Sequence, residues 1–181
     1  DYMTEAAVIC QRIDHDTISR MAARLSLLKG KLYIIGLGGS LANAIHMAAD
    51  FRKLCDIDAE AFDNIAELTA RINDEGPETI FGDWLKKISP QDILMVLSVG
   101  GGTAEVSPAI CRGVDAAKTA GAAIFGITGP SGGYTAARAD LCIKVPVTNE
   151  KHITPHTEAF QAIVWHCLVS HPLLQKNRTT W

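Results

Sequence analysis

His46 and Asp50 are the residues whose types and spacing most directly suggest chemistry. They lie four positions apart in a segment predicted to be helical, so both side chains leave from one face of the helix. An imidazole and a carboxylate on one face can bind the same cation, or one can act as a base beside it. A solvated helix face has the same spacing, so the pair alone leaves both interpretations open.

Glu158 and His166 lie on the last predicted helix among apolar residues, where a charged group is costly unless it is paired. They are eight residues apart, roughly 12 Å along a straight helix, so one intact helix does not easily bring both to one ion. We expect either a broken helix or, preferably, a second subunit that completes the site. His152 and His156 form another pair at a loop-to-helix junction, which we interpret as structural or as supporting the site.

Two glycine-rich turns, Gly36–Ser40 and Ser98–Thr103, each follow an apolar run and precede a predicted helix. Glycines let the backbone approach a ligand, and the helix that follows directs unpaired N–H groups at an anion. Each turn ends in a hydroxyl residue, so we predict an anion site with phosphate as the guest. Leu41 stands where a dinucleotide fingerprint needs its last glycine, and no GxxxxGK[ST] motif occurs, which disfavours a nucleotide.

The elements that must position these residues follow a repeated order of strand, glycine-rich turn and helix. Short apolar runs predict strands, and runs of helical period or cap signals predict the helices between them. The expected strands are 31–36, 58–62, 92–98, 122–128 and 141–145. The expected helices are 4–28, as one helix or two, then 41–54, 65–72, 78–88, a helix from Thr103 through Lys118, and 154–170. The expected N-caps are Thr4 and Asp16 for the first segment and Thr154 for the last helix. Strands that are apolar on both faces and alternate with helices predict a three-layer αβα sandwich, doubly wound around a parallel sheet of about five strands. Ligands bind such sheets beyond the carboxyl ends of the strands, where both turns are expected to lie.

Composition limits the classes of protein that remain. The 181 residues, 48% apolar and 20% charged, predict one domain, with residues 1–30 as an N-terminal helical segment that packs in an oligomer and residues 31–181 as the α/β domain. A net charge of −3 supplies no basic surface for nucleic acid or an anionic membrane. Because the apolar runs are short and the start is acidic, we expect a cytoplasmic protein. Five scattered cysteines, an odd number without CxxC spacing, argue against disulfides and a sulfur-ligated zinc, and we expect them to be buried.

Five motifs in order resemble those of the sugar isomerase (SIS) domain family, in its phosphoheptose isomerase branch. GLGGSLANAIHMAADF is similar to GNGGSxxxAxHFAxEL, LTARINDEG to LTAxxND, SVGGGT to STSGNS, GITGPSGG to LTGxxGG, and EAFQAIVWH to QExHxxxxH. The resemblance spans residues 4 to 172. It implies a cytoplasmic, zinc-dependent homotetramer with sites between subunits. It also implies conversion of sedoheptulose 7-phosphate to glycero-manno-heptose 7-phosphate, which feeds heptose biosynthesis for lipopolysaccharide and other surface glycans.

Position by position, the resemblance implies roles for individual residues. The metal ligands would be His46, Asp50, Glu158 and His166, with Asp50 taking the proton and His166 donating to the neighbouring oxygen. The substrate-binding residues would be Gly38, Gly39, Ser40, Asn73, Asp74, Ser98, Val99, Gly100, Thr103 and Glu158. Two histidines and two carboxylates suit zinc, and also iron or manganese.

The chain departs from the branch at several of these positions. Asp50 replaces Glu and Glu158 replaces Gln, so one carboxylate is shorter and another is added. Leu37 replaces the Asn of GNGGS, which removes a contact to the sugar.

The second turn departs as well. Val99 and Gly100 replace the Thr and Ser of STSGNS, which deletes two hydroxyls. No Lys or Arg lies in either turn, so a phosphate must rely on backbone N–H groups and helix dipoles, or on Arg52 or Lys53.

Three alternatives therefore stay open: an isomerase of a different sugar phosphate, an NAD-dependent oxidoreductase, and a non-catalytic SIS regulator similar to the replication-initiator-associating members. Retention of His46 and His166 favours an enzyme over a regulator.

Overall fold

A five-stranded parallel sheet forms the centre of the computed structural model, which describes residues 1–179. Its strand order is β2-β1-β3-β4-β5, and every neighbouring pair is parallel. The strands are β1 (Leu32–Ile35), β2 (Ala59–Ala61), β3 (Ile93–Ser98), β4 (Ala123–Thr128) and β5 (Leu141–Lys144). All residues of β3 are buried, as the apolar run on both faces predicts. The predicted doubly wound α/β fold is confirmed.

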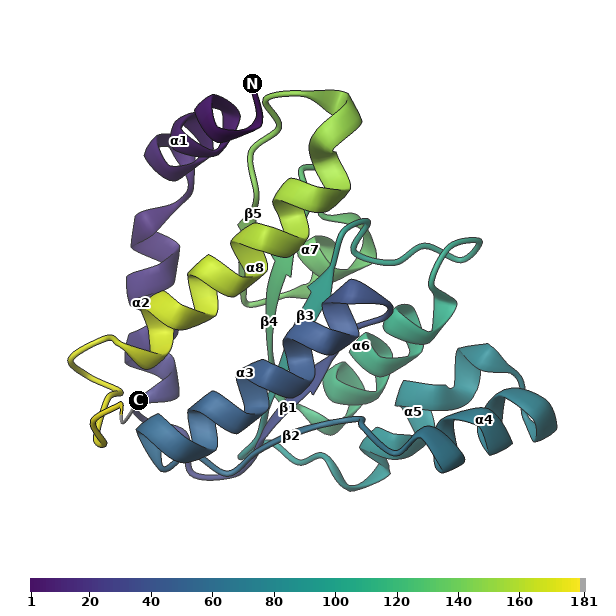
Figure 1. Cartoon of the computed structure of the whole chain (residues 1–181). Coiled ribbons are helices and arrows are strands. Elements are labelled where there is room, and N and C mark those ends of the chain that lie inside the picture. The colour runs from purple at the N-terminus through teal and green to yellow at the C-terminus, as the bar shows by residue number, and fades with distance from the viewer. Residues whose placement is uncertain (180–181) are drawn as a thin grey trace.

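Helices cover both faces of the sheet (Figure 1). One layer contains α1 (Tyr2–Arg12), α2 (His15–Leu25), α3 (Gly39–Cys55) and α8 (Ile153–Val169), and the other contains α4 (Ile65–Asp74), α5 (Ile80–Trp84), α6 (Pro108–Ala120) and α7 (Gly133–Arg138). Three short 3₁₀ turns lie at Pro77–Thr79, Leu85–Lys87 and Glu150–His152. Each layer encloses its own apolar core, around Phe51 and Trp165 on one side and Phe81 and Ile110 on the other. Burial of these two cores holds the helices against the sheet.

The N-terminal segment contains two helices, and its caps differ from the expected Thr4 and Asp16. Asp1 caps α1 and Asp14 caps α2. The Asp14 carboxylate accepts hydrogen bonds from the backbone N–H of Thr17 at 2.9 Å and from its hydroxyl at 2.7 Å. A side chain three residues before a free N–H is the geometry that an N-cap requires, and Thr4 and Asp16 lie inside their helices instead.

The helix expected directly after Thr103 begins five residues later, at Pro108. The hydroxyl of Thr103 accepts hydrogen bonds from the backbone N–H groups of Glu105 at 3.2 Å and Val106 at 2.9 Å, which closes a turn in place of a helix. Proline fits the first helical position because its missing N–H has no partner there. Residues 99–107 therefore form a longer loop than the sequence predicts.

The last helix, α8, is continuous from Ile153 to Val169, which rules out the broken helix, the less favoured of the two alternatives. It begins one residue before the expected cap Thr154, after a short 3₁₀ turn. All five cysteines are free, but only Cys55 is fully buried, so the expectation that they are buried is wrong for the others. Within residues 1–179, no helix combines the length and apolar character needed to cross a membrane.

Candidate active site

The first glycine turn lies at the point where the winding of the sheet reverses. β1 is followed by α3 on one face, and its neighbour β3 is followed by α6 on the other. The carboxyl ends of β1 and β3 are therefore the place where open α/β sheets bind ligands. Gly38 has φ of +59°, a conformation that favours glycine, and it starts α3.

Helices α3 and α8 lie side by side and bring His46, Asp50 and His166 together in one chain (Figure 1). The Asp50 Oδ2 atom lies 3.6 Å from Nε2 of His46 and 3.5 Å from Nε2 of His166. The two imidazole rings have centroids 5.9 Å apart. The side chains of His46 and His166 are 61% and 54% exposed and that of Asp50 is 18% exposed, so the cluster opens to solvent.

The donor atoms of this cluster fit a divalent cation. Two ligands that are each 2.0–2.2 Å from a tetrahedral ion lie about 3.4 Å apart. The carboxylate-to-imidazole distances of 3.5 and 3.6 Å match that spacing and are too long for good hydrogen bonds. Nitrogen and oxygen donors of this kind suit zinc, iron or manganese.

Trp165 holds the Asp50 carboxylate in place. Its indole Nε1 donates a hydrogen bond of 3.1 Å to Asp50 Oδ2, and its ring is almost completely buried. Trp165 was not predicted to have a role in the site. Its position next to His166 in the sequence was a usable signal, because a buried indole N–H needs an acceptor.

Glu158 lies elsewhere on α8, outside the cluster of His46, Asp50 and His166. A Cβ atom added at Gly39 would lie 2.6 Å from the Glu158 carboxylate, so this carboxylate rests against the first residue of α3. A negative charge is favourable at a helix N-terminus. Since α8 is continuous, Glu158 and His166, eight positions apart, are separated by roughly 12 Å along the helix.

A buried polar network joins the same two helices. Gln161, with no exposed surface, donates from Nε2 to the Ser40 hydroxyl at 3.0 Å. Asn43 donates to Gln161 Oε1 at 2.9 Å and to the backbone carbonyl of Glu158 at 2.9 Å. Ser40, predicted to line an anion site, is thus also part of the α3–α8 contact. Neither Asn43 nor Gln161 was predicted to have a role, since only the packing of α3 on α8 joins them.

The second glycine turn is supported by the loop before α7. The Ser98 hydroxyl accepts a hydrogen bond of 3.1 Å from the backbone N–H of Gly101. A Cβ at Gly101 would lie 2.0 Å from the carbonyl oxygen of Gly132, and one at Gly133 would lie 2.1 Å from that of Gly100. The GPSGG stretch therefore has a structural reason to be glycine-rich: its backbone packs directly on the other loop.

Other predicted contacts lie around this second turn. The carbonyl of Val99 accepts a hydrogen bond of 2.9 Å from the N–H of Gly129, and Thr103 is exposed. Lys144, at the carboxyl end of β5, packs its side chain against Gly132, since a Cβ there would meet Lys144 Cδ at 3.0 Å. The aliphatic stem of a lysine thus lies against the loop that supports the second turn, although neither turn contains a Lys or Arg.

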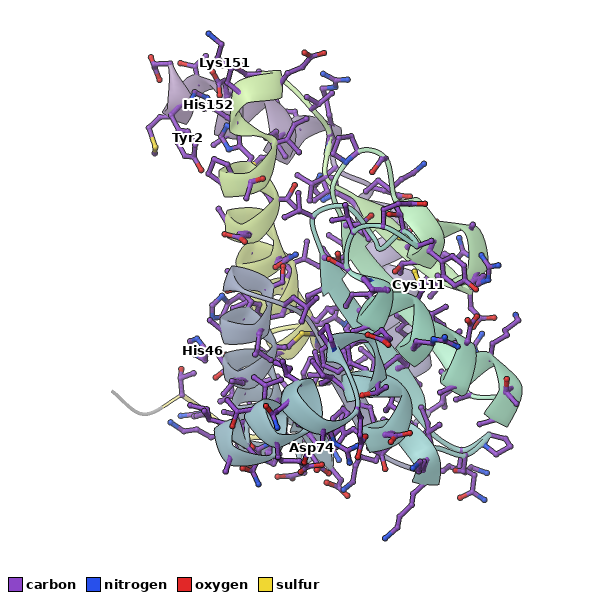
Figure 2. The ribbon with its side chains drawn as sticks, turned by 90° about the vertical axis from the view of Figure 1, so that its right-hand side faces the viewer. Tyr2, His46, Asp74, Cys111, Lys151 and His152 are labelled. Carbon is purple, nitrogen blue, oxygen red and sulfur yellow. The ribbon has the colours of Figure 1, made fainter. Side chains whose placement is uncertain are left out.

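Asn73 and Asp74 lie at the end of α4 and are exposed. The amide of Asn73 donates to the carboxylate of Asp74 at 2.7 Å, and neither residue belongs to the cluster of imidazoles and carboxylate. Figure 2 shows Asp74 and His46 on separate parts of the molecule. In the single chain, these two predicted substrate residues are therefore not brought to the cluster of His46, Asp50 and His166.

A cavity of about 380 Å³ opens beside the first glycine turn, between α3, α4 and α6. Leu37, Gly38 and Leu41 form its wall on the side of the turn, and Leu68 and Ile72 of α4 face them. Its lining is mostly apolar, in keeping with Leu37 at a position where the family motif has Asn.

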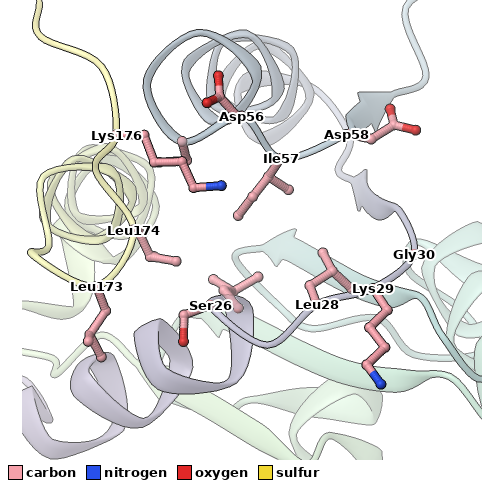
Figure 3. Close-up of a pocket in the computed structure, with 12 residues that line it drawn as sticks. Ser26, Leu28, Lys29, Gly30, Asp56, Ile57, Asp58, Leu173, Leu174 and Lys176 are labelled. Carbon is pink, nitrogen blue, oxygen red and sulfur yellow. The ribbon is translucent and has the colours of Figure 1, made fainter.

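A second cavity, of about 260 Å³, lies between the end of α2, the entry to β1 and the C-terminal segment (Figure 3). Gly30 and Asp58, which line it, precede β1 and β2. This cavity is therefore at the amino ends of the strands, the edge at which sheets of this type do not bind substrate.

Known proteins resemble the chain in sequence and in fold. It is 36% identical over 146 residues to a phosphoheptose isomerase from Rhodospirillum rubrum, covering 77% of this chain and 73% of that protein. It is also 36% identical over 137 residues to a phosphoheptose isomerase from Roseiflexus, covering 69% and 68% of the two chains. The solved structure of phosphoheptose isomerase GmhA from Neisseria gonorrhoeae superposes with a TM-score of 0.82 at 24% identity and covers 93% of each chain.

A search against protein-family models found no match. These two sequence relatives are nevertheless more than 30% identical to the chain, and the matched residues make up more than two thirds of each relative. The structural neighbour has the same fold. The five motifs on which the resemblance rested thus lie in a chain with the matching architecture. The chain belongs to the phosphoheptose isomerase family of aldose–ketose isomerases.

Proposed function

We propose that the protein converts sedoheptulose 7-phosphate to glycero-manno-heptose 7-phosphate with the help of a divalent metal, zinc first among the candidates. The observation that carries the proposal is the cluster of His46, Asp50 and His166, whose donor atoms lie at the spacing of metal ligands. The names of the sequence relatives support the choice of substrate.

The reaction moves a proton from C1 to C2 of the open-chain ketose through an enediolate. Asp50 is the base that removes the C1 proton and returns it to C2. Its Oδ2 accepts the Trp165 hydrogen bond, and Oδ1 accepts none within residues 1–179, which leaves that oxygen available for substrate. His166 transfers the second proton, from O1 to O2, so atoms and charges balance over the cycle.

The metal, when bound, supplies a Lewis acid that stabilises the negative oxygen of the enediolate. His46 and His166 would hold it with Asp50. Glu158 lies beside Gly39 in the same chain, so Glu158 would reach the ion of a neighbouring subunit, not its own.

A homo-oligomer, with a tetramer as the expected form, completes the site in this proposal. The two imidazoles are more than half exposed in the single chain, whereas enediolate chemistry benefits from exclusion of water. His46 also lies seven positions after Gly39 in α3, so the cluster is about 10 Å along the helix from the first glycine turn. A neighbouring copy that lays its glycine turns over the cluster supplies both the cover and the phosphate site, and this arrangement also provides a role for Asn73 and Asp74.

The test is turnover of sedoheptulose 7-phosphate by the purified chain, treated with a chelator and then given zinc, iron or manganese. Metal-dependent formation of the aldose supports the proposal. Absence of turnover with every metal, in protein that is folded and binds metal, contradicts it. NAD consumption without isomerisation would point to the oxidoreductase alternative, and a chain that binds no metal and turns over no sugar would point to the regulator.

The second candidate is isomerisation of a different sugar phosphate, and one observation favours it. Leu37 lines a mostly apolar cavity beside the first turn, where the family motif supplies a polar Asn. A parallel series of phosphorylated and free ketoses of five to eight carbons separates the two candidates. Only the first candidate, isomerisation of sedoheptulose 7-phosphate, implies a role in heptose biosynthesis for surface glycans and the expected cytoplasmic location.

A further inference from the structure

A second group of possible metal ligands lies at the other end of α8. Glu5 of α1, His152 of the 3₁₀ turn and His156 of α8 each offer one donor atom, and these atoms lie within 4.8 Å of one another. Figure 2 shows His152 beside Tyr2 and Lys151 at one end of the molecule, well separated from His46. Ten residues of one continuous helix separate His156 from His166, which is about 15 Å. The two groups are therefore independent sites.

The Glu5 carboxylate is the centre of this group. Its Oε2 atom lies 2.7 Å from Nδ1 of His152 and 2.9 Å from Nε2 of His156, and its Oε1 accepts a hydrogen bond of 3.1 Å from the Asn149 amide. These contacts engage both oxygens of the carboxylate and orient it, as the groups around a metal site orient a ligating carboxylate.

The group is largely shielded from water. The side chains are 17% exposed for Glu5, 4% for His156 and 37% for His152, so one side stays open for an ion to enter. Tyr2 stacks on the His156 ring with centroids 4.1 Å apart and an angle of 16° between the planes. This stacking favours the ring orientation in which Nε2 faces Glu5.

A second observation concerns the far nitrogen of His156. The Nδ1 atom of His156 and the hydroxyls of Thr148 and Thr157 are buried and have no hydrogen-bond partner within residues 1–179. All three residues line one cavity of about 10 Å³, the size of a single water site. A metal-bound histidine donates its other N–H to an acceptor, and a water held by the two threonine hydroxyls is such an acceptor.

We propose that Glu5, His152 and His156 bind a divalent first-row metal such as zinc, separate from the ion of the active site. Two histidines and one carboxylate are a common ligand set for zinc and iron, with the open side left for water. The donor atoms are now 2.7 and 2.9 Å apart, and ligands of a tetrahedral ion are about 3.4 Å apart, so the carboxylate moves back by about half an ångström as the metal replaces the two hydrogen bonds. The bound ion fixes the first turn of α1 to the start of α8.

The experiment measures zinc per chain after the full chain is stripped with a chelator, incubated with zinc chloride and desalted. The wild type is expected to retain two zinc ions and H46A/H166A one. Adding E5Q to H46A/H166A is expected to remove the remaining ion, whereas adding E150Q leaves it. Glu150 is the matched control because it is exposed, lies on the 3₁₀ turn that carries His152 and receives the same Glu-to-Gln substitution as Glu5.

A second variant guards against loss by misfolding. H152A changes the most exposed ligand and leaves the Glu5–His156 contact in place. Zinc at 100 times its Kd is expected to raise the Tm of H46A/H166A by about 5–10 °C and to leave that of H46A/H166A/H152A unchanged. The proposal is overturned if H46A/H166A retains no zinc, or if E5Q and H152A leave its zinc content and Tm shift unaltered. Neither measurement uses turnover, so the result is independent of the proposed substrate.

Discussion

Replacing Asp50 by Asn separates chemistry from folding at the proposed base. Asn has the same shape and keeps an oxygen that can accept the 3.1 Å hydrogen bond from Trp165. A hydrogen bond to a charged group contributes about 1.5–3 kcal/mol and a neutral one about 1 kcal/mol, so the loss in stability is about 1 kcal/mol. For a chain of 181 residues this corresponds to a Tm lower by about 2–4 °C.

The expected loss of activity is far larger. Removing the base costs about 10²–10⁴-fold in kcat, and the loss of an anionic ligand between His46 and His166 also weakens metal binding. The assay follows aldose formation from sedoheptulose 7-phosphate at saturating zinc, with thermal unfolding measured on the same samples. Asp16→Asn is the matched control, because Asp16 is an exposed carboxylate on α2 outside the cluster. A kcat within a factor of three of the wild type would refute the role of Asp50 as base.

Three further substitutions test a contact of the cluster, a contact at the first glycine turn and a helix cap. Trp165→Phe keeps an aromatic side chain but removes the N–H that donates to Asp50, so zinc affinity or kcat should fall about 10–100-fold, measured by zinc titration and turnover. An unchanged affinity and kcat would mean that the indole N–H does not position the carboxylate. Gly39→Ala places a Cβ against the Glu158 carboxylate and should reduce activity to the level of Glu158→Ala. The double variant should be no less active than either single variant, because both changes disturb the same contact. Losses that add in the double variant would contradict the contact. Asp14→Ala removes a helix cap and should lower the free energy of unfolding at pH 7 by about 0.5–2 kcal/mol in urea melts. The backbone hydrogen bond that Asp14 accepts, and then the side-chain one, lower the pKa of its carboxyl group. This contribution is therefore fully present above the ordinary pKa and is lost as the pH falls through the lowered value. A difference between the two proteins that does not shrink as the pH is lowered would refute this reasoning.

Local patterns predicted the parts of the site that a single element determines. The spacing of His46 and Asp50 placed both on one face of α3, and the glycine turns were expected at strand ends, where the structure has them. The strands followed from short apolar runs because burial on both faces requires them. The start of α6 was missed since the Thr103 hydroxyl closes a turn, a choice that composition does not encode.

Contacts between distant segments could not be predicted from any window of sequence. Trp165 meets Asp50, and Gln161 meets Ser40, only because α8 packs along α3. In the same way, Glu5 lies more than 140 positions from His152 and reaches it through the packing of α1 on the start of α8. In each case a buried polar group required a partner, but the identity of that partner depended on the tertiary fold.

The charges around the two glycine turns favour the second turn as the phosphate site of the proposed reaction. The Glu158 carboxylate occupies the N-terminus of α3, so a second anion there would be repelled. The Ser98 turn has Lys144 beside its supporting loop instead. Lys144→Ala should therefore raise KM for a phosphorylated ketose about tenfold, as expected for loss of one charged contact, and leave kcat nearly unchanged. Lys118→Ala, an exposed lysine in the last turn of α6, is the control. Equal KM values for the two variants would show that the phosphate binds elsewhere.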